Sequence, residues 1–352
     1  RLSMGADLRD WLAGQYGKAG GMRAIRRAAD RLFRALAEYV LSADPAPAEG
    51  AAAALTVANG RVMAAVAGGA PFDLLGLLPA PYRGDVEAVE AELDAIVGLE
   101  PVKAYVRDLA ANVQAQQRRK AQGLPVAAVN RHMIFTGNPG TGKTTIARIL
   151  AKYLKAIGAL EGGQLVEVSR ADLVGRYVGH TAPLTNGVIR SALGGVLFID
   201  EAYSLYRGEQ DSFGLEAIDT LVKGIEDHRD AFVVILAGYT AEMQQFLTAN
   251  SGLASRFPNQ IEFPDYTADA LWAITEAQAK AKGYTLDAGC EAPLKAYFAR
   301  RQAEDAARAG NGRMARNLLE RAILNQSRRL IADPAADLAR IEPGDFDLDP
   351  QD

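Results

Sequence analysis

The chain has 352 residues, of which 49% are hydrophobic and 23% charged, and its formal net charge is −4. This length suggests two or three domains with a sizeable folded core, and no apolar stretch approaches the roughly 18 residues of a membrane span. The acidic balance argues against a nucleic-acid motor, and the single cysteine, Cys290, excludes an internal disulfide framework and favours a cytoplasmic protein.

Residues 1–84 predict a helical N-terminal region. Over the first 42 residues, apolar side chains that include Trp11, Leu32 and Val40 recur at the spacing of a helix. Proline and glycine mark breaks at 43–50 and 79–84, on either side of an alanine-rich segment. We interpret this region as a docking site for a client or an adaptor.

In residues 85–264, short apolar strands alternate with segments long enough to be helices. The candidate strands are residues 132–135, 165–168, 196–199, 232–236 and 260–263. This alternation predicts an α/β fold with a five-stranded parallel sheet between two layers of helices. Ligands of such folds bind at the carboxyl ends of the strands.

The strand pattern ends near Tyr266, and residues 265–332 predict a small helical lid domain. Its three expected helices lie around 267–282, 288–308 and 314–331. Residues 333–352 are acidic and contain proline, so we expect a tail that either packs loosely or forms a short capping segment.

A glycine-rich loop joins the first predicted strand of this sheet to the next helix. The loop consists of Gly137, Asn138, Pro139, Gly140, Thr141, Gly142, Lys143, Thr144 and Thr145. It fits the Walker A pattern G-x-x-x-x-G-K-[ST], in which backbone N–H groups surround phosphates. Lys143 would reach the β and γ oxygens, and Thr144 would bind Mg²⁺. ATP with Mg²⁺ is therefore the predicted ligand.

A second motif follows the strand at 196–199, which ends in two adjacent carboxylates, Asp200 and Glu201. In a nucleotide-hydrolysing site, Asp200 would hold Mg²⁺ through its water shell. Glu201 would orient and polarise the water that attacks the γ-phosphate. The two motifs together predict an ATP hydrolase.

Further strings carry a resemblance to a known family. They are Asp172–Thr181, Leu197–Leu205, Val234–Tyr239, Ser255–Pro258 and Phe263–Tyr266, in addition to the loop at 136–145. With these strings the chain resembles the AAA+ ATPases, and more narrowly the branch that contains stage V sporulation protein K and the red-type Rubisco activase. The resemblance covers residues 90–332, and residues 1–84 lie outside it.

The resemblance implies roles for two further segments. Ile96, Val97 and Gly98 would lie along the adenine. Tyr177, Val178 and Gly179 correspond to the first pore loop of the family, which grips a peptide through packing area without reading its sequence. Residues 208–214 correspond to a second loop that faces the pore.

The resemblance also implies cationic groups at the γ-phosphate. Arg256 would be an arginine finger given in trans to a neighbouring subunit, and Arg313 would contact the phosphate in cis, with Arg316 as the alternate. Tyr239 or Thr240 would be the sensor after the fourth strand. The chain has Ala254 where its relatives commonly have arginine, and this departure could weaken hydrolysis.

The function these residues favour is a hexameric ring that couples ATP hydrolysis to the remodelling or threading of a protein client. A nucleotide-gated scaffold with weak turnover is an alternative that Ala254 keeps open. A red-type Rubisco activase is a less favoured one, because the N-terminal region is longer than that activase needs. Glu201 argues against a small-molecule phosphotransferase, and the aromatic residue Tyr177 argues against a nucleic-acid motor.

Overall fold

The structure, a computed structural model, divides into two compact units, Arg1–Tyr82 and Arg83–Asp352. It describes residues 2–16, part of 25–48, and residues 50–75, 86–126, 130–249, 251–333 and 335–348. The predicted break at 79–84 and the predicted domain boundary after residue 84 lie outside the described residues. Among the described helices, none is both long and apolar enough to cross a membrane.

The described part of the first unit contains a helix, as the sequence predicts, and also a four-stranded sheet that the sequence analysis did not predict. The strands are β1 (Leu2–Met4), β2 (Ala53–Ala58), β3 (Arg61–Val66) and β4 (Phe72–Asp73), in the order β1-β2-β3-β4. Only β1 and β2 run parallel. Helix α1 (Ala6–Tyr16) contributes Leu8 to the core over this sheet, beside Leu55 and Val62.

The turn between β2 and β3 explains why alanine forms strands here. Asn59 and Gly60 both have positive φ, 52° and 74°. Two such residues form the two-residue turn whose twist matches antiparallel strands. The turn therefore sets a hairpin in which Leu55 and Val62 face the core, in spite of the high helix propensity of alanine.

The second unit contains the predicted parallel sheet. Its strands are β5 (Met133–Thr136), β6 (Leu165–Val168), β7 (Val196–Ile199), β8 (Val233–Gly238) and β9 (Asn259–Glu262). Their order is β6-β7-β8-β5-β9, and every neighbouring pair is parallel. The prediction of a five-stranded sheet in an α/β domain is confirmed.

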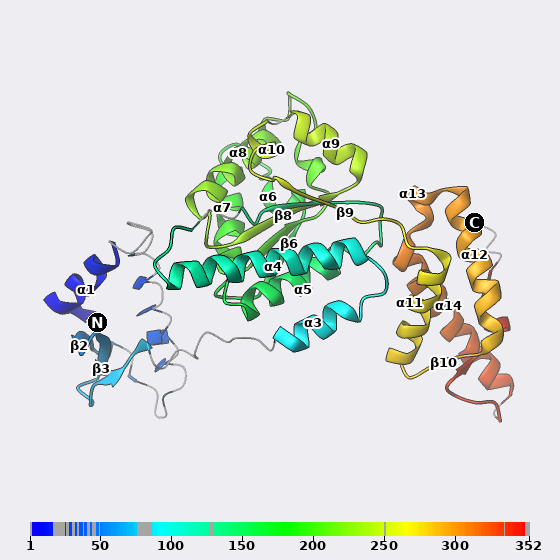
Figure 1. Ribbon diagram of the computed structural model, residues 1–352, viewed down its shortest axis with the longest axis horizontal. Helices are drawn as coiled ribbons and strands as arrows, with labels where there is room; N and C mark the ends of the chain where they lie inside the picture. Colours follow the sequence, from blue (N-terminus) through cyan, green and yellow to red (C-terminus); the bar gives the residue numbers. More distant parts are fainter. Residues whose placement is uncertain are drawn as a thin grey trace. The chain divides into compact units, whose positions relative to one another are not determined.

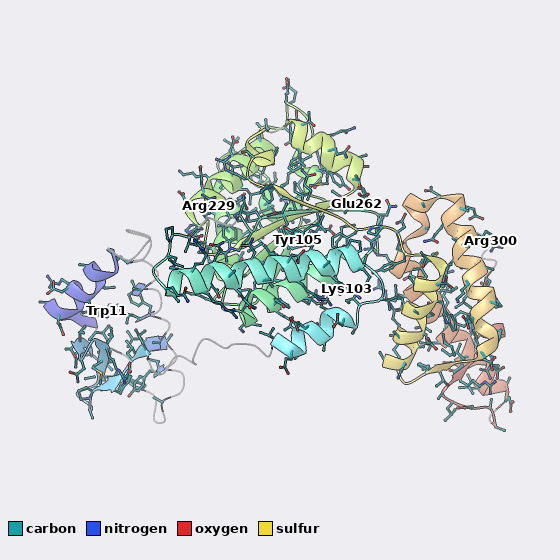
Figure 2. The ribbon with its side chains drawn as sticks, in the orientation of Figure 1. Trp11, Lys103, Tyr105, Arg229, Glu262 and Arg300 are labelled. Carbon is teal, nitrogen blue, oxygen red and sulfur yellow. The ribbon has the colours of Figure 1, made fainter. Side chains whose placement is uncertain are left out.

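Helices cover both faces of this sheet (Figure 1). One layer contains α3 (Val86–Asp94), α4 (Glu100–Ala121) and α5 (Lys143–Ala156), and the other contains α6 (Arg170–Leu173), α7 (Thr181–Ala192), α8 (Ser212–Asp227) and α9 (Thr240–Ala249). Alternate residues of a strand enter different cores: Phe135 packs with the α5 layer, and Ile134 with the α8 layer. Figure 2 shows Lys103 and Tyr105 on α4.

The lid domain is helical, as predicted. It contains α11 (Ala268–Ala281), α12 (Glu291–Glu304), α13 (Ala306–Ala309) and α14 (Asn311–Ala332), and Figure 1 shows α11, α12 and α14 side by side. Strand β10 (Thr285–Leu286) pairs with β11 (Arg340–Ile341). The buried carboxylate of Asp345 accepts from Arg329 at 2.8 Å. Of the two expectations for residues 333–352, the described part forms the capping segment.

His132, just before β5, is buried, and its ring packs against those of Phe232 and Phe257. Its Nδ1 accepts a hydrogen bond from the backbone N–H of Val234 at 3.0 Å, so this nitrogen carries no proton. Burial, together with the nearby Arg131 and Arg229, lowers the pKa of His132 to about 4. The folded protein therefore holds the neutral imidazole.

This histidine predicts a loss of stability in acid. An unfolded His132 takes up a proton near pH 6.5, but the folded one does not do so until about pH 4, so lowering the pH across this window favours the unfolded chain. From this group alone we expect the free energy of unfolding to be about 2 kcal/mol lower at pH 5 than at pH 8. Urea denaturation at several pH values measures it. The difference in the free energy of unfolding between pH 5 and pH 8 should shrink in His132→Gln and persist in His180→Gln, which alters an exposed histidine. An equal pH dependence of stability in both variants would contradict the assignment of this effect to His132.

Candidate nucleotide site

The glycine-rich loop lies between β5 and α5, where the sequence predicts it. Gly142 has a φ of 95° and immediately precedes α5, so the first N–H groups of this helix have no capping side chain and can receive an anion. A Cβ atom on Gly140 would stand 2.1 Å from the carbonyl oxygen of Gly310, and one on Gly137 would stand 2.3 Å from that of Phe263. The loop thus requires glycine for close backbone packing, and its cradle of N–H groups fits a phosphate chain.

Lys143 is the first residue of α5, and its ammonium group is turned back into the loop. Its Nζ donates to the carbonyl oxygens of Gly137 at 2.7 Å and Asn138 at 2.9 Å. Burial lowers the pKa of Lys143; the charge of Asp200 opposes this shift and that of Arg313 adds to it. The structure therefore brings Lys143, Asp200 and Arg313 into one electrostatic environment.

The two carboxylates follow β7 directly. Glu201 has a φ of 48°, in the left-handed region, and its N–H donates to Oδ1 of Asp200 at 3.0 Å. This turn leaves the Glu201 side chain exposed at the rim of an open hollow that Asp200 and Ser169 also line. A non-glycine residue held in this conformation is typical of a functional position.

Two tyrosines lie behind the carboxylates. Tyr203, in the short 3₁₀ helix η2 (Ala202–Leu205), stacks on Tyr239 with ring centroids 5.8 Å apart. Burial raises the pKa of Tyr203 to about 12, and the charge of Glu201 adds to the shift. Tyr239, a predicted sensor, is thus close to the turn that carries Glu201, and Thr240 begins α9.

The segment predicted to lie along adenine joins α3 to α4. Gly98 has a φ of 64°, and a Cβ atom there would be 3.7 Å from the ring of Tyr266. The hydroxyl of Tyr266 in turn donates to the carbonyl oxygen of Thr141 at 3.3 Å. Ile96 packs against the core, and Val97 follows it in the chain. Gly98 is therefore connected to the glycine-rich loop through one side chain.

Asn311, at the start of α14, joins the lid to the loop. Its side chain is fully buried and donates to Oδ1 of Asp265 at 2.7 Å and to the carbonyl oxygen of Pro139 at 3.3 Å. Its own Oδ1 accepts from the N–H of Tyr266 at 2.9 Å, and the Asn138 amide donates to both oxygens of Asp265. From the sequence we assigned no role to Asn311. The sequence feature that could have indicated it is an asparagine between two glycines at the start of a predicted helix. Asparagine tolerates the left-handed conformation that the structure shows there, with a φ of 46°.

Arg313 and Arg316 both lie on the exposed side of α14. Arg313 is close enough to lower the pKa of Lys143, and the position of a Cβ on Gly140 would be 2.9 Å from its backbone nitrogen. These observations place Arg313 beside the glycine-rich loop.

Arg256 makes its side-chain contacts away from Lys143. It lies between α10 (Ser251–Ala254) and β9, and its guanidinium donates to the carbonyl oxygen of Gly252 at 2.9 Å and pairs with Glu226 at 3.1 Å. Within one chain Arg256 is thus held by Glu226 at the end of α8.

The predicted first pore loop joins α6 to α7. Tyr177 is 69% exposed and Val178 is 87% exposed, and Gly179 has a φ of 81°. The ring of Tyr177 makes an edge contact with His180, with centroids 5.6 Å apart. Two large apolar side chains are therefore presented to solvent on a short turn after β6.

Comparisons with known proteins agree with this geometry. Residues 133–265 match the model of the ATPase family associated with various cellular activities, and residues 267–352 match that of the AAA lid domain. Stage V sporulation protein K of Bacillus subtilis is 45% identical over 250 residues, which are 71% of this chain and 78% of that protein.

A second relative and one solved structure extend the comparison. The chloroplastic ribulose bisphosphate carboxylase/oxygenase activase of Cyanidioschyzon merolae is 42% identical over 73% of this chain and 88% of that protein. The solved AAA domain of FIGL-1 matches 72% of this chain and 80% of its own with a TM-score of 0.50 at 20% identity, a likeness that concerns the fold alone.

Proposed function

Since this chain belongs to the AAA family of ATPases and hydrolyses ATP, we propose that it assembles into a hexameric ring that pulls on or remodels a protein client. The observation that carries the proposal is the turn with Tyr177 and Val178, which exposes two apolar side chains between α6 and α7 of the nucleotide domain. Such a turn can grip an extended polypeptide of any sequence by packing area.

The residues of the site suit the hydrolysis of a Mg²⁺-bound triphosphate. The N–H groups of the loop and the ammonium of Lys143 would hold the phosphates, and Thr144 and Asp200 would hold the metal, which neutralises charge that develops on the phosphate oxygens. Glu201 would orient the attacking water. Arg313 would bind the γ-phosphate from the lid, and Arg256 would reach it from a neighbouring subunit.

The scaffold alternative predicts assembly with little turnover. The observation that keeps it open is Ala254, which removes one arginine near Arg256. Steady-state ATP turnover measured together with the mass of the complex distinguishes the two. Assembly in ATP with measurable turnover supports the remodelling ring, whereas a monomer in saturating ATP would contradict any ring.

Replacing Tyr177 with alanine should separate ATP turnover from client binding. We expect the hydrolysis rate to stay within about twofold and the affinity for an unfolded polypeptide to fall at least tenfold, an effect of about 1.4 kcal/mol or more. The measurement is the anisotropy of fluorescent casein, a generic unfolded probe, in the presence of ATP.

The matched control is Leu324→Ala, which shortens a side chain on α14 that is 56% exposed. The control should bind casein as the parent does. Equal casein binding by the parent and Tyr177→Ala would contradict the pore role, and loss of ATP binding by Tyr177→Ala would place this residue at the nucleotide instead.

A further inference from the structure

Arg170, the first residue of α6, contacts two places that lie 34 or more residues further along the chain. Its guanidinium donates to the carbonyl oxygens of Ser204 at 2.9 Å and Leu205 at 3.1 Å, which follow Glu201 in η2. It also forms a two-point ion pair with Asp211, at 2.7 and 2.9 Å. We infer that Arg170 is a positioning residue. It couples the turn that carries Glu201 to the two loops that we assign to the pore, residues 174–180 and 208–214.

The ion pair is well shielded. The side chains of Arg170 and Asp211 are only 17% and 12% exposed, and the planar guanidinium matches both carboxylate oxygens. Hydrogen bonds from Arg170 hold the pKa of Asp211 below its usual range, against the opposing effect of burial. The pair therefore stays charged and closed at neutral pH.

Asp211 carries the contact into α8. Its Oδ1 also accepts from the N–H of Gly214 at 3.1 Å and so caps the helix. A Cβ atom on Gly214 would stand 2.1 Å from the carbonyl oxygen of Leu205 and 2.9 Å from the Arg170 guanidinium. Loop 208–214 is thus packed against the turn that carries Glu201, with Arg170 filling the space between them.

Arg170 also carries the contact toward Tyr177. Ser169 and Asp172 form a reciprocal capping box that fixes the first turn of α6, and this helix ends at Leu173, four residues before Tyr177. Arg170 therefore lies on the short helix that leads directly into the loop with Tyr177. A shift of η2 on hydrolysis would move Asp211 and α6 together, because a single side chain holds all three.

This inference rests on the proposed function, and hydrogen exchange can test the two separately. The backbone exchange of residues 174–180 and 206–214 would be compared in ADP and in a non-hydrolysable ATP analogue with Mg²⁺. We expect the parent to change in both segments. Arg170→Gln should lose the change in 206–214 and keep the one in 137–145, and its kcat should fall about tenfold with KM for ATP within about twofold.

A second variant, Asp211→Asn, removes the charge of the ion pair and keeps an acceptor for the helix cap. It should also lose the nucleotide-dependent change of exchange in residues 206–214, and it serves as the test if Arg170→Gln does not fold. Arg170→Lys should restore part of the kcat, because it returns the charge without the two-point geometry. The matched control is Arg148→Gln, which breaks an exposed pair with Glu167.

A parent whose segments 174–180 and 206–214 do not respond to the nucleotide would overturn the proposed function, and the inference with it. A normal response of 206–214 in Arg170→Gln or in Asp211→Asn, with a normal parent, would overturn the inference alone. Loss of the response in Arg148→Gln as well would show a general softening of the domain and would also overturn it.

Discussion

Glu201→Gln should lower the rate of ATP hydrolysis by about 10²- to 10³-fold and leave ATP binding intact. A positioned general base contributes a factor of this size, and glutamine keeps the shape of the side chain but cannot take up a proton. The left-handed turn at Glu201 leaves its side chain exposed next to Asp200. In the proposed role this carboxylate orients a water and does not hold the phosphates, so the affinity for ATP should depend little on its charge.

Phosphate release measures the rate, and a fluorescent ATP analogue measures the affinity. The control is Glu161→Gln, which alters an exposed carboxylate in the connection between α5 and β6. This control should hydrolyse ATP within about twofold of the parent. Turnover at the parent rate by Glu201→Gln would remove Glu201 from the role of base.

Arg256→Ala should lower hydrolysis by about 10³-fold, because an arginine at the γ-phosphate stabilises the charge of the transition state. Within one chain Arg256 pairs with Glu226, so a finger acting in trans has to leave that pair when a neighbour docks. The loss should therefore be repaired by a subunit that supplies an intact Arg256, even when that subunit cannot use ATP itself.

Mixing Arg256→Ala with Lys143→Ala subunits tests this repair. Each variant alone should be nearly inactive, and the mixture should hydrolyse ATP well above the sum of the two. The same mixture made with Arg190→Ala, which alters an exposed arginine of α7, should show no such gain over its components. A rate per active site that is independent of the mixing ratio would contradict action in trans.

Much of the nucleotide domain can be predicted from the sequence because its signals are local. Each buried strand is a short apolar run, and the glycine-rich loop is a contiguous motif between one strand and one helix. The predictions for Lys143, Asp200 and Arg313 agree with the electrostatic environment that they share. The roles of these residues stay predictions.

The rest could not be predicted because it depends on pairs that are distant in sequence or on a conformation that overrides propensity. Nothing in the spacing of Arg170 and Asp211 indicates an ion pair. The contact of Asn311 with Pro139 joins two residues that are 172 positions apart in the sequence. In the N-terminal unit, alanine content favours a helix, and only the Asn59-Gly60 pair indicates the hairpin.

The buried amide of Asn311 has a thermodynamic consequence. Since one side chain is shared by the glycine-rich loop and the lid helix, the free energy of nucleotide binding and that of lid placement are linked. Linkage is reciprocal. If bound ATP raises the preference for one lid angle by some factor, a neighbouring subunit that imposes this angle raises the affinity for ATP by the same factor. Affinity for ATP would then report on the neighbours of a subunit as well as on its own residues.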